Sequence, residues 1–192
     1  MQELPEPLKV LVDQLSALPG LGPKSALRMA LTMLKWPEGR TRQLGDSIST
    51  LRDRLCLCSR CNGLADSDPC SICGDPGRDE SLLCLVSEWD SLLAMEQGGF
   101  YQGLYMILGG LLAPLDGVQP VHLELDKLRE RLRCQDPEYK VSELILALGT
   151  TLDAENTASH IKRLVEQEFP HVSLSRLAQG IPGGAVQGVP GA

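Results

Sequence analysis

The sequence has no long hydrophobic run, and this absence argues against a membrane-spanning helix. Its apolar stretches are all shorter than the roughly 18 consecutive apolar residues that a span requires. The amino-terminal segment is acidic and does not resemble a targeting peptide. Since 192 residues with 43% hydrophobic content are ordinary for a folded chain, we expect one domain or two small ones, located in the cytoplasm.

Histidine is scarce as well. The sequence contains three, His122, His160 and His171, and none has an acidic or nucleophilic partner at the spacing of a catalytic motif. We interpret them as surface or core-edge residues, and we predict no catalytic residue among them.

Positive charge is in deficit over the chain, but it is concentrated in one segment. The formal net charge of −7 argues against a protein that coats nucleic acid over its whole surface. Residues 23–54 differ, because they carry seven basic and three acidic side chains. This local excess favours nucleic-acid binding, and the alternative is an ordinary solvated face.

Four of the seven cysteines form two Cys-x-x-Cys pairs, Cys58 with Cys61 and Cys70 with Cys73. Each pair turns tightly enough to direct two thiolates at one point, and two pairs complete a closed tetrahedral zinc site. A closed site has no open coordination position, so we expect this Zn²⁺ to be structural. The polar linker between the pairs could not bury a core alone, and metal binding would supply the missing folding free energy.

Two disulfides or four buried thiols are the alternatives to zinc. The symmetrical spacing and the odd number of cysteines favour zinc in a reducing compartment. Cys56 lies two residues before Cys58 and is an alternative ligand, whereas Cys84 lies in an apolar run and is expected in the core.

Hydrophobic periodicity predicts three helices in the amino-terminal part of the chain. The first covers residues 8–18, the second begins at Pro23 and ends before Pro37, and the third covers residues 41–55.

After Asp79 short apolar strands alternate with helices. The predicted strands are residues 81–86, 105–108, 144–148 and 171–175, and the predicted helices lie near residues 91–95, 125–132 and 156–168. This alternation is typical of an α/β fold with a mainly parallel sheet that is covered on both faces. Residues 180–192 are rich in glycine and proline, and we expect an irregular tail there.

Residues 18–26, LPGLGPKSA, look like a helix-hairpin-helix. Gly20 and Gly22 would let the backbone turn so that its N–H groups point outward at the positive end of the second helix, where a DNA phosphate can bind. Lys24 and Arg28 lie four residues apart on one helix face and could contact neighbouring phosphates. Such contacts are independent of base sequence and sensitive to salt. The alternative is a simple helical corner with a glycine cap.

In this order, the motifs resemble the RecR family of recombination mediators along nearly the whole chain. Four segments carry the resemblance: residues 18–26, the four cysteines with Asp68-Pro69, Arg78-Asp79, and residues 108–117 with their Leu-Gly-Gly and Pro-Leu-Asp-Gly motifs. A weaker match covers residues 176–182.

The resemblance implies an α/β multidomain protein. Its parts would be a helix-hairpin-helix domain (1–55), a four-cysteine zinc finger (56–78), a Toprim domain (79–179) and an irregular tail (180–192). It also implies a non-enzymatic homo-oligomer, a dimer or a tetrameric ring, that binds DNA. This oligomer would act with RecO, and in some systems RecF, to load RecA onto single-stranded DNA. The tail departs from the family pattern after Gly183-Gly184, in a segment implied to help join subunits.

The Toprim resemblance raises an enzymatic alternative, a magnesium-dependent nuclease or primase-like enzyme. Catalytic Toprim domains hold magnesium with a glutamate after the first strand and an acidic pair after a later one. Here Ser87 takes the glutamate position and Glu88 follows one residue late, which reverses the direction of the side chain near a strand end. Asp153 and Glu155 could face one way and bind magnesium weakly, or they could favour the start of a helix instead. A third hypothesis is a metal-stabilised interaction scaffold that does not bind DNA.

Overall fold

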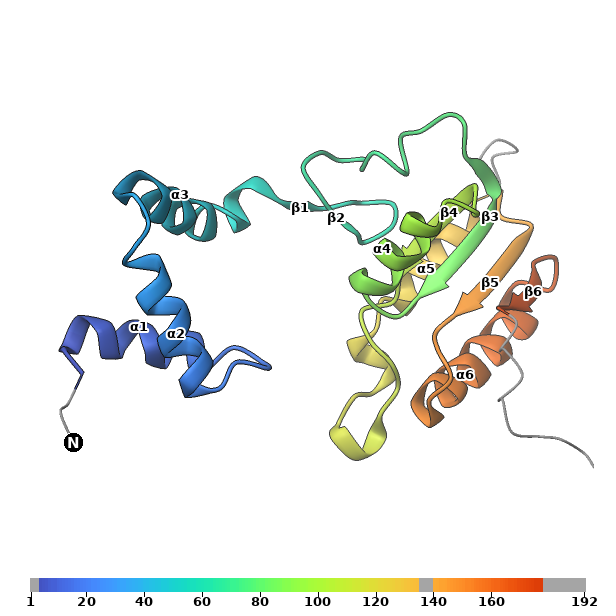
Figure 1. Cartoon of the computed structure of the whole chain (residues 1–192). Helices are drawn as coiled ribbons and strands as arrows, with labels where there is room; N and C mark the ends of the chain where they lie inside the picture. Colours follow the sequence, from blue (N-terminus) through green and yellow to red (C-terminus); the bar gives the residue numbers. More distant parts are fainter. Residues whose placement is uncertain (1–3, 135–139, 178–192) are drawn as a thin grey trace, which may run out of the picture. The chain divides into compact units, whose positions relative to one another are not determined.

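The structure, a computed structural model, describes residues 4–134 and 140–177. They fall into two compact units, one ending at Arg54 and the other beginning at Leu55 (Figure 1). Within these ranges no helix combines the length and the apolar character needed to cross a membrane. The predicted tail, residues 180–192, lies outside the described residues.

The amino-terminal unit contains three α-helices, α1 (Glu6–Ser16), α2 (Pro23–Met33) and α3 (Glu38–Ser49), followed by a short 3-10 helix at Arg52–Arg54. The prediction of three helices is confirmed, with α2 starting at Pro23. The third helix was predicted as continuous to residue 55, and this is wrong. The hydroxyl groups of Ser49 and Thr50 both donate to the carbonyl oxygen of Asp46, and such side-chain bonds compete with the helical ladder.

The core of this unit is small and lies between α1 and α2. Its buried residues are Val12, Ala26 and Ala30. Four leucines pack around them: Leu8, Leu11, Leu15 and Leu27. In contrast, α3 has no buried residue.

The second unit begins with a two-stranded antiparallel ribbon of β1 (Cys56–Leu57) and β2 (Leu64–Ala65). A four-stranded sheet follows, formed by β3 (Asp79–Val86), β4 (Gly103–Ile107), β5 (Glu143–Ala147) and β6 (Ser173–Arg176). The strand order is β4-β3-β5-β6 and every pairing is parallel, as the sequence predicted.

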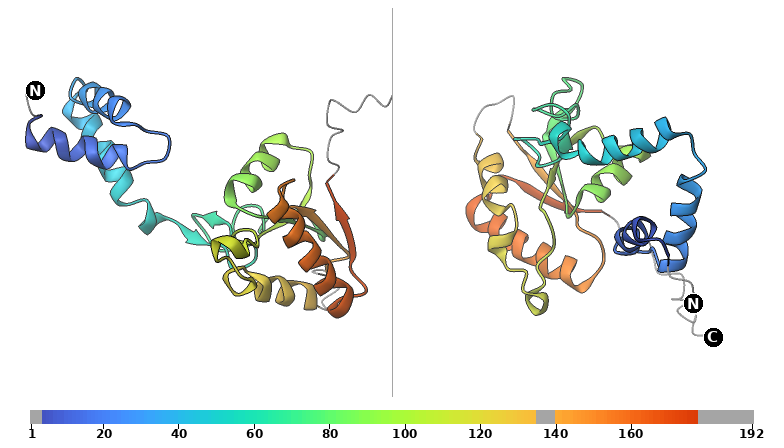
Figure 2. Two further views of the ribbon diagram at one scale, coloured as in Figure 1. Left: turned by 90° about the horizontal axis from the view of Figure 1, so that it is seen from below. Right: turned by 90° about the vertical axis from the view of Figure 1, so that its left-hand side faces the viewer.

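Helices cover both faces of this sheet, as Figure 2 shows. They are α4 (Trp89–Gly98), α5 (Leu125–Arg133) and α6 (Leu152–Glu168), and two short 3-10 helices lie at Pro114–Asp116 and Pro120–His122. Alternate residues of β3 point to opposite faces. Leu83 and Leu85 pack with buried residues of α5 and α6, whereas Cys84 and Val86 pack with Leu92 of α4.

The α6 helix begins four residues earlier than predicted. Thr151 is its amino-terminal cap, since its Oγ1 accepts a hydrogen bond from the N–H of Ala154 at 3.2 Å. Asp153 and Glu155 therefore lie in the first turn of this helix.

Candidate metal centre and nucleic-acid interface

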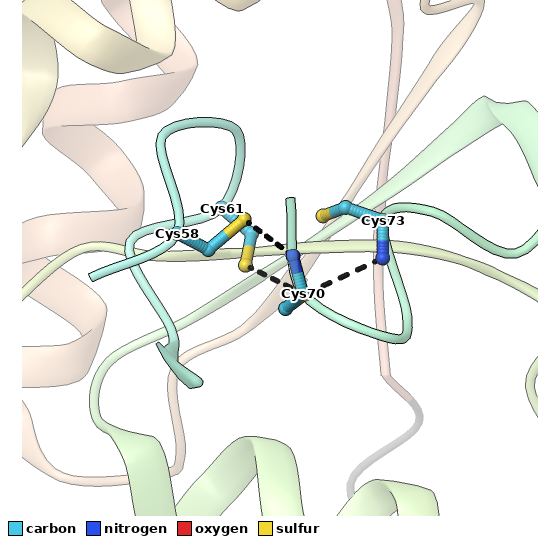
Figure 3. Close-up of side chains that lie close together, drawn as sticks. All are labelled: Cys58, Cys61, Cys70 and Cys73. Atoms are coloured by element: carbon cyan, nitrogen blue, oxygen red, sulfur yellow. Dashed lines mark hydrogen bonds between the residues drawn. The ribbon is translucent and has the colours of Figure 1, made fainter. Parts of the chain in front are cut away.

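The four predicted cysteine ligands come together at one point. Figure 3 shows Cys58, Cys61, Cys70 and Cys73 converging from two loops, and their sulfur atoms all lie within 4.8 Å of one another. All four residues are buried, and the Sγ atoms of Cys61 and Cys70 are 3.7 Å apart. A tetrahedral zinc ion with Zn–S distances of about 2.3 Å requires sulfur–sulfur distances of about 3.8 Å. The separation of this pair fits such a site.

Backbone N–H groups point at the sulfur atoms and favour thiolates. The donors to Cys61, Cys58 and Cys70 are the N–H groups of Gly63, Cys70 and Cys73, at 3.3, 3.4 and 3.4 Å respectively. A hydrogen bond from Cys73 lowers the pKa of the Cys61 thiol to about 6. The same hydrogen bond and burial raise the pKa of the Cys73 thiol.

The tight turn after Cys61 depends on two residues. Asn62 has a φ of +62°, in the left-handed region that asparagine tolerates better than most residues. At Gly63 a Cβ atom would lie 3.1 Å from the Cys61 sulfur, so glycine allows the close approach between backbone and ligand.

The first cysteine turn is bound to the sheet and helices of the same unit. The Asn62 carbonyl oxygen accepts a hydrogen bond from Trp89 Nε1, and its Oδ1 accepts one from Lys127 Nζ, both at 3.0 Å. The Cys61 carbonyl oxygen accepts from the N–H of Ile107 at 2.9 Å. These contacts attach the turn to α4, α5 and β4.

A part-buried charge network joins both cysteine turns to the sheet. Arg60 donates through Nη1 to the carbonyl oxygen of Cys73 and through Nη2 to Glu80 Oε2, each at 2.6 Å. Arg131 of α5 donates to the same Glu80 oxygen at 3.4 Å. The sequence alone does not reveal the roles of these residues, because their partners are 13 to 51 positions apart and follow no local pattern.

The three carboxylates of the enzymatic alternative do not form a metal cluster. Among the described residues, the four cysteines are the only group of three or more side chains placed to hold a metal ion. Glu88 occupies the N-cap position of α4 and is exposed. Asp153 and Glu155 are two apart on a helix and so point in different directions, and Glu155 accepts a hydrogen bond from Arg176 at 2.8 Å. Of the two interpretations of this pair, the structure agrees with the start of a helix, because both carboxylates lie in the first turn of α6.

The predicted hairpin is open to solvent. Gly20 has a φ of +79°, which a side chain would strain, and Gly22 caps the start of α2 in an extended conformation. A Cβ atom built on either glycine would meet nothing within 4 Å. Both glycines, Lys24 and Arg28 are exposed.

The hairpin also presents unused donors and positive charge. In the part of the chain that the structure describes, the N–H groups of Gly22 and Lys24 have no backbone acceptor. Neither Lys24 nor Arg28 is paired with a carboxylate of those residues. An anion could therefore reach the amino-terminal end of α2 between free N–H groups and free cations.

Three stretches of the chain match models of known protein families. Residues 8–52 match the RecR helix-hairpin-helix, residues 55–75 match the RecR zinc finger with four cysteines, and residues 81–178 match the Toprim domain. A recombination protein RecR from Nitratidesulfovibrio vulgaris is 60% identical over 185 residues, which are 96% of this chain and 90% of that protein. The chain belongs to the RecR family.

Other members of the family are also similar along nearly their whole length. The recombination protein RecR of Maridesulfovibrio salexigens is 58% identical over 96% of this chain and 90% of its own. That of Alcanivorax borkumensis is 45% identical over 95% of this chain and 90% of its own. The resemblance inferred from the motifs is therefore confirmed.

Proposed function

We propose that this chain is a non-enzymatic, DNA-binding recombination mediator that acts in DNA repair in the cytoplasm. It would act with RecO, and in some systems RecF, to promote RecA loading on single-stranded DNA. The observation that carries this proposal is the open hairpin, where free N–H groups lie beside the unpaired cations Lys24 and Arg28.

In this proposal the hairpin binds the DNA backbone. The N–H groups around Gly20 and Gly22 would donate to one phosphate, while Lys24 and Arg28, one helical turn apart, would contact its neighbours. Such contacts fix the position of the protein on DNA without reading bases, so binding would not depend on sequence.

Zinc would hold the finger in shape and would take no part in chemistry. Cys58, Cys61, Cys70 and Cys73 are the proposed ligands, and all four are buried. We also propose the division into a helix-hairpin-helix domain (1–55), a finger (56–78), a Toprim domain (79–179) and a tail (180–192). The finger would stay attached to the Toprim domain through Asn62 and Arg60.

The chain would form a homo-oligomer through its amino-terminal unit. Large apolar side chains are exposed there: Leu34 at 70%, Ile48 at 68% and Leu51 at 56%. Ile48 lies in the last turn of α3, a helix without buried residues, and Leu51 follows it, which supports a second copy as the partner that covers this end of the helix. The acidic chain would attract RecO if the surface of RecO is basic, and opposite charge would speed that encounter.

The DNA-binding proposal is tested by Lys24→Glu, with Lys140→Glu as the matched control. Lys140 is an exposed lysine in the other unit, so the control makes the same charge change far along the chain from the hairpin. We expect Lys24→Glu to weaken DNA binding by about tenfold and to reduce the slope of log affinity against log salt by about one. Fluorescence anisotropy with a labelled oligonucleotide at several salt concentrations measures both quantities.

Unchanged DNA affinity in Lys24→Glu would contradict the proposal and favour the scaffold hypothesis. The enzymatic alternative predicts magnesium-dependent DNA cleavage that is lost in Asp153→Asn, whereas the mediator proposal predicts no cleavage by either protein.

A further inference from the structure

Trp36, between α2 and α3, forms a stacked pair with Arg40 of α3. The Cζ atom of Arg40 lies 4.1 Å from the centroid of the Trp36 ring, within the range of a cation–π contact. Trp36 is only half-buried, and it is not part of the core formed by Val12, Ala26 and Ala30. Packing of the unit therefore does not account for a tryptophan at this position.

A shallow hollow lies beside the Trp36 ring. Its volume is about 200 Å³, and five residues line it: Arg28, Met29, Thr32, Met33 and Trp36. Arg40 does not line it, so the hollow borders a part of the ring that the guanidinium leaves uncovered. A flat, largely apolar group can enter such a space and stack on the indole.

The hollow is continuous with the hairpin through Arg28. Lys24, Arg28 and Thr32 are four residues apart on α2 and therefore lie along one face of that helix. Within the described residues, Lys24, Arg28 and Arg40 have no acidic partner. The surface thus combines a row of free cations with an apolar ring, the combination that binds unpaired nucleic-acid strands.

We propose that Trp36, Arg40, Arg28, Met29 and Met33, here called the tryptophan surface, hold one unpaired base of single-stranded DNA. The base would stack on Trp36 over the two methionines, while Arg28 and Arg40 would contact phosphates on either side of it. This inference rests on the proposed DNA-binding function and adds a preference for single strands, because duplex bases are stacked and paired inside the helix.

A second copy of the chain is the competing occupant. A twofold contact centred on the tryptophan surface would bring Arg28 and Arg40 close to the same residues of the other copy, and like charges at an interface cost affinity. A polyanion has no such penalty. Charge complementarity therefore favours DNA.

The test compares two 20-residue strands, oligo(dT) and an abasic strand with the same sugar-phosphate backbone. The full chain is expected to bind oligo(dT) about tenfold more tightly, a difference of about 1.4 kcal/mol, because one base stacks on an aromatic ring. The Trp36→Leu variant is expected to bind both strands with the same affinity, equal to that of the parent chain for the abasic strand. Trp36→Phe keeps an aromatic ring and should retain most of the difference.

Tryptophan fluorescence gives an independent readout. The chain has two tryptophans, so Trp36→Leu leaves Trp89 as the sole emitter. Oligo(dT) is expected to quench the emission of the parent chain and to leave that of Trp36→Leu unchanged. Circular dichroism checks that the variant keeps its helices, which is expected because Trp36 lies outside the core.

Each contrary outcome has one meaning. A parent chain that binds neither strand overturns the proposed function and, with it, this inference. A parent chain that binds both strands equally, or a Trp36→Leu variant that keeps the preference for oligo(dT), overturns this inference alone. A lower assembly mass in Trp36→Leu without a change in base preference would place the tryptophan surface between copies instead.

Discussion

At the scale of single residues, two arginines connect the finger to the sheet, and each uses its planar guanidinium to reach several acceptors. Arg60 joins the second cysteine turn to Glu80, as described above. Arg78 donates through Nη2 to Glu96 of α4 at 2.6 Å and through Nη1 to the carbonyl oxygens of Tyr101 and Gly103. Its side chain is only 13% exposed. Fork-shaped donors of this kind hold several loops at once, which a lysine could not do equally well.

The Arg78–Glu96 pair gives a prediction about pH. The hydrogen bond from Arg78 lowers the pKa of Glu96 below its ordinary value of 4.5. A carboxylate with a lowered pKa stabilises the folded state above its ordinary pKa, and this contribution is lost as the pH falls through the lowered value. Glu96→Gln should therefore reduce the unfolding temperature at pH 7, and the difference from the parent chain should shrink in acid below pH 4.5.

Thermal denaturation from pH 3 to pH 7 measures this difference. Glu130→Gln is the control, because Glu130 is exposed on α5 and should show little effect at any pH. If the unfolding temperature of Glu96→Gln stays below that of the parent chain by the same amount down to pH 3, the lowered pKa of Glu96 does not contribute to stability as predicted.

At the scale of elements, the finger is a loop structure that depends on its cysteines. Between the ribbon of β1 and β2 and the start of β3 it has no helix or longer strand, and its buried side chains are the four cysteines with Asn62. Such a segment has too little apolar surface to fold alone, so metal binding would supply the free energy. Its contacts with Trp89 and Lys127 mean that the finger and helices α4 and α5 depend on one another.

Removal of one ligand should release the metal and disturb the contact with Trp89. We expect about one zinc per chain, and Cys73→Ser should retain much less because a tetrahedral site with three thiolates binds weakly. In a Trp36→Phe background the emission of Trp89 should shift to longer wavelength on loss of zinc, because its indole N–H leaves Asn62. Elemental analysis and emission spectra give the two readouts.

Cys56→Ser is the matched control for this substitution. Cys56 is exposed, and its thiol lies 3.5 Å from the carbonyl oxygen of Ala65. The Cys56→Ser variant should keep its full zinc content. A full zinc content in Cys73→Ser, or its loss in Cys56→Ser, would contradict the proposed ligand set.

At the scale of the whole molecule, the two units differ in how completely they bury their apolar residues. The unit from Leu55 has a core on each face of its sheet, whereas the unit up to Arg54 buries only Val12, Ala26 and Ala30 among the described residues. Small domains bury a low share of their surface on folding, and with three buried side chains this unit has little apolar burial to stabilise it. The exposed face of α3 should therefore gain stability from association.

A charge placed on that face should dissociate the proposed homo-oligomer. Ile48→Lys is expected to reduce the mass in solution to that of one chain, because burying an unpaired ammonium group in an apolar contact costs several kcal/mol, a large part of the free energy of a typical interface. Leu115→Lys is the control, since Leu115 is fully exposed in the other unit. Sedimentation velocity over a range of concentrations measures the mass. An unchanged mass in Ile48→Lys would show that α3 does not join the copies.

Local patterns in the sequence were sufficient to locate the helices and strands, but not all of their ends, and to identify the cysteine cluster. The metal-ligand spacing is visible within a short stretch of sequence, from Cys58 to Cys73. Apolar runs such as residues 81–86 indicate strands that are buried on both faces. Gly20 of the hairpin could also be recognised locally, because a positive φ is a property of one residue.

Only the tertiary structure decided which distant residues meet. Asn62 binds Lys127 and Glu80 bridges Arg60 and Arg131, and these pairs are separated by 20 to 65 positions. No periodicity records such contacts, since they arise when the sheet brings the ends of separate strands and helices together. The start of α6 was missed for a related reason. A threonine followed by acidic residues is compatible with a loop as well as with the start of a helix. Here the burial of Ala154 and Ala158 in the core of the sheet favours the helix.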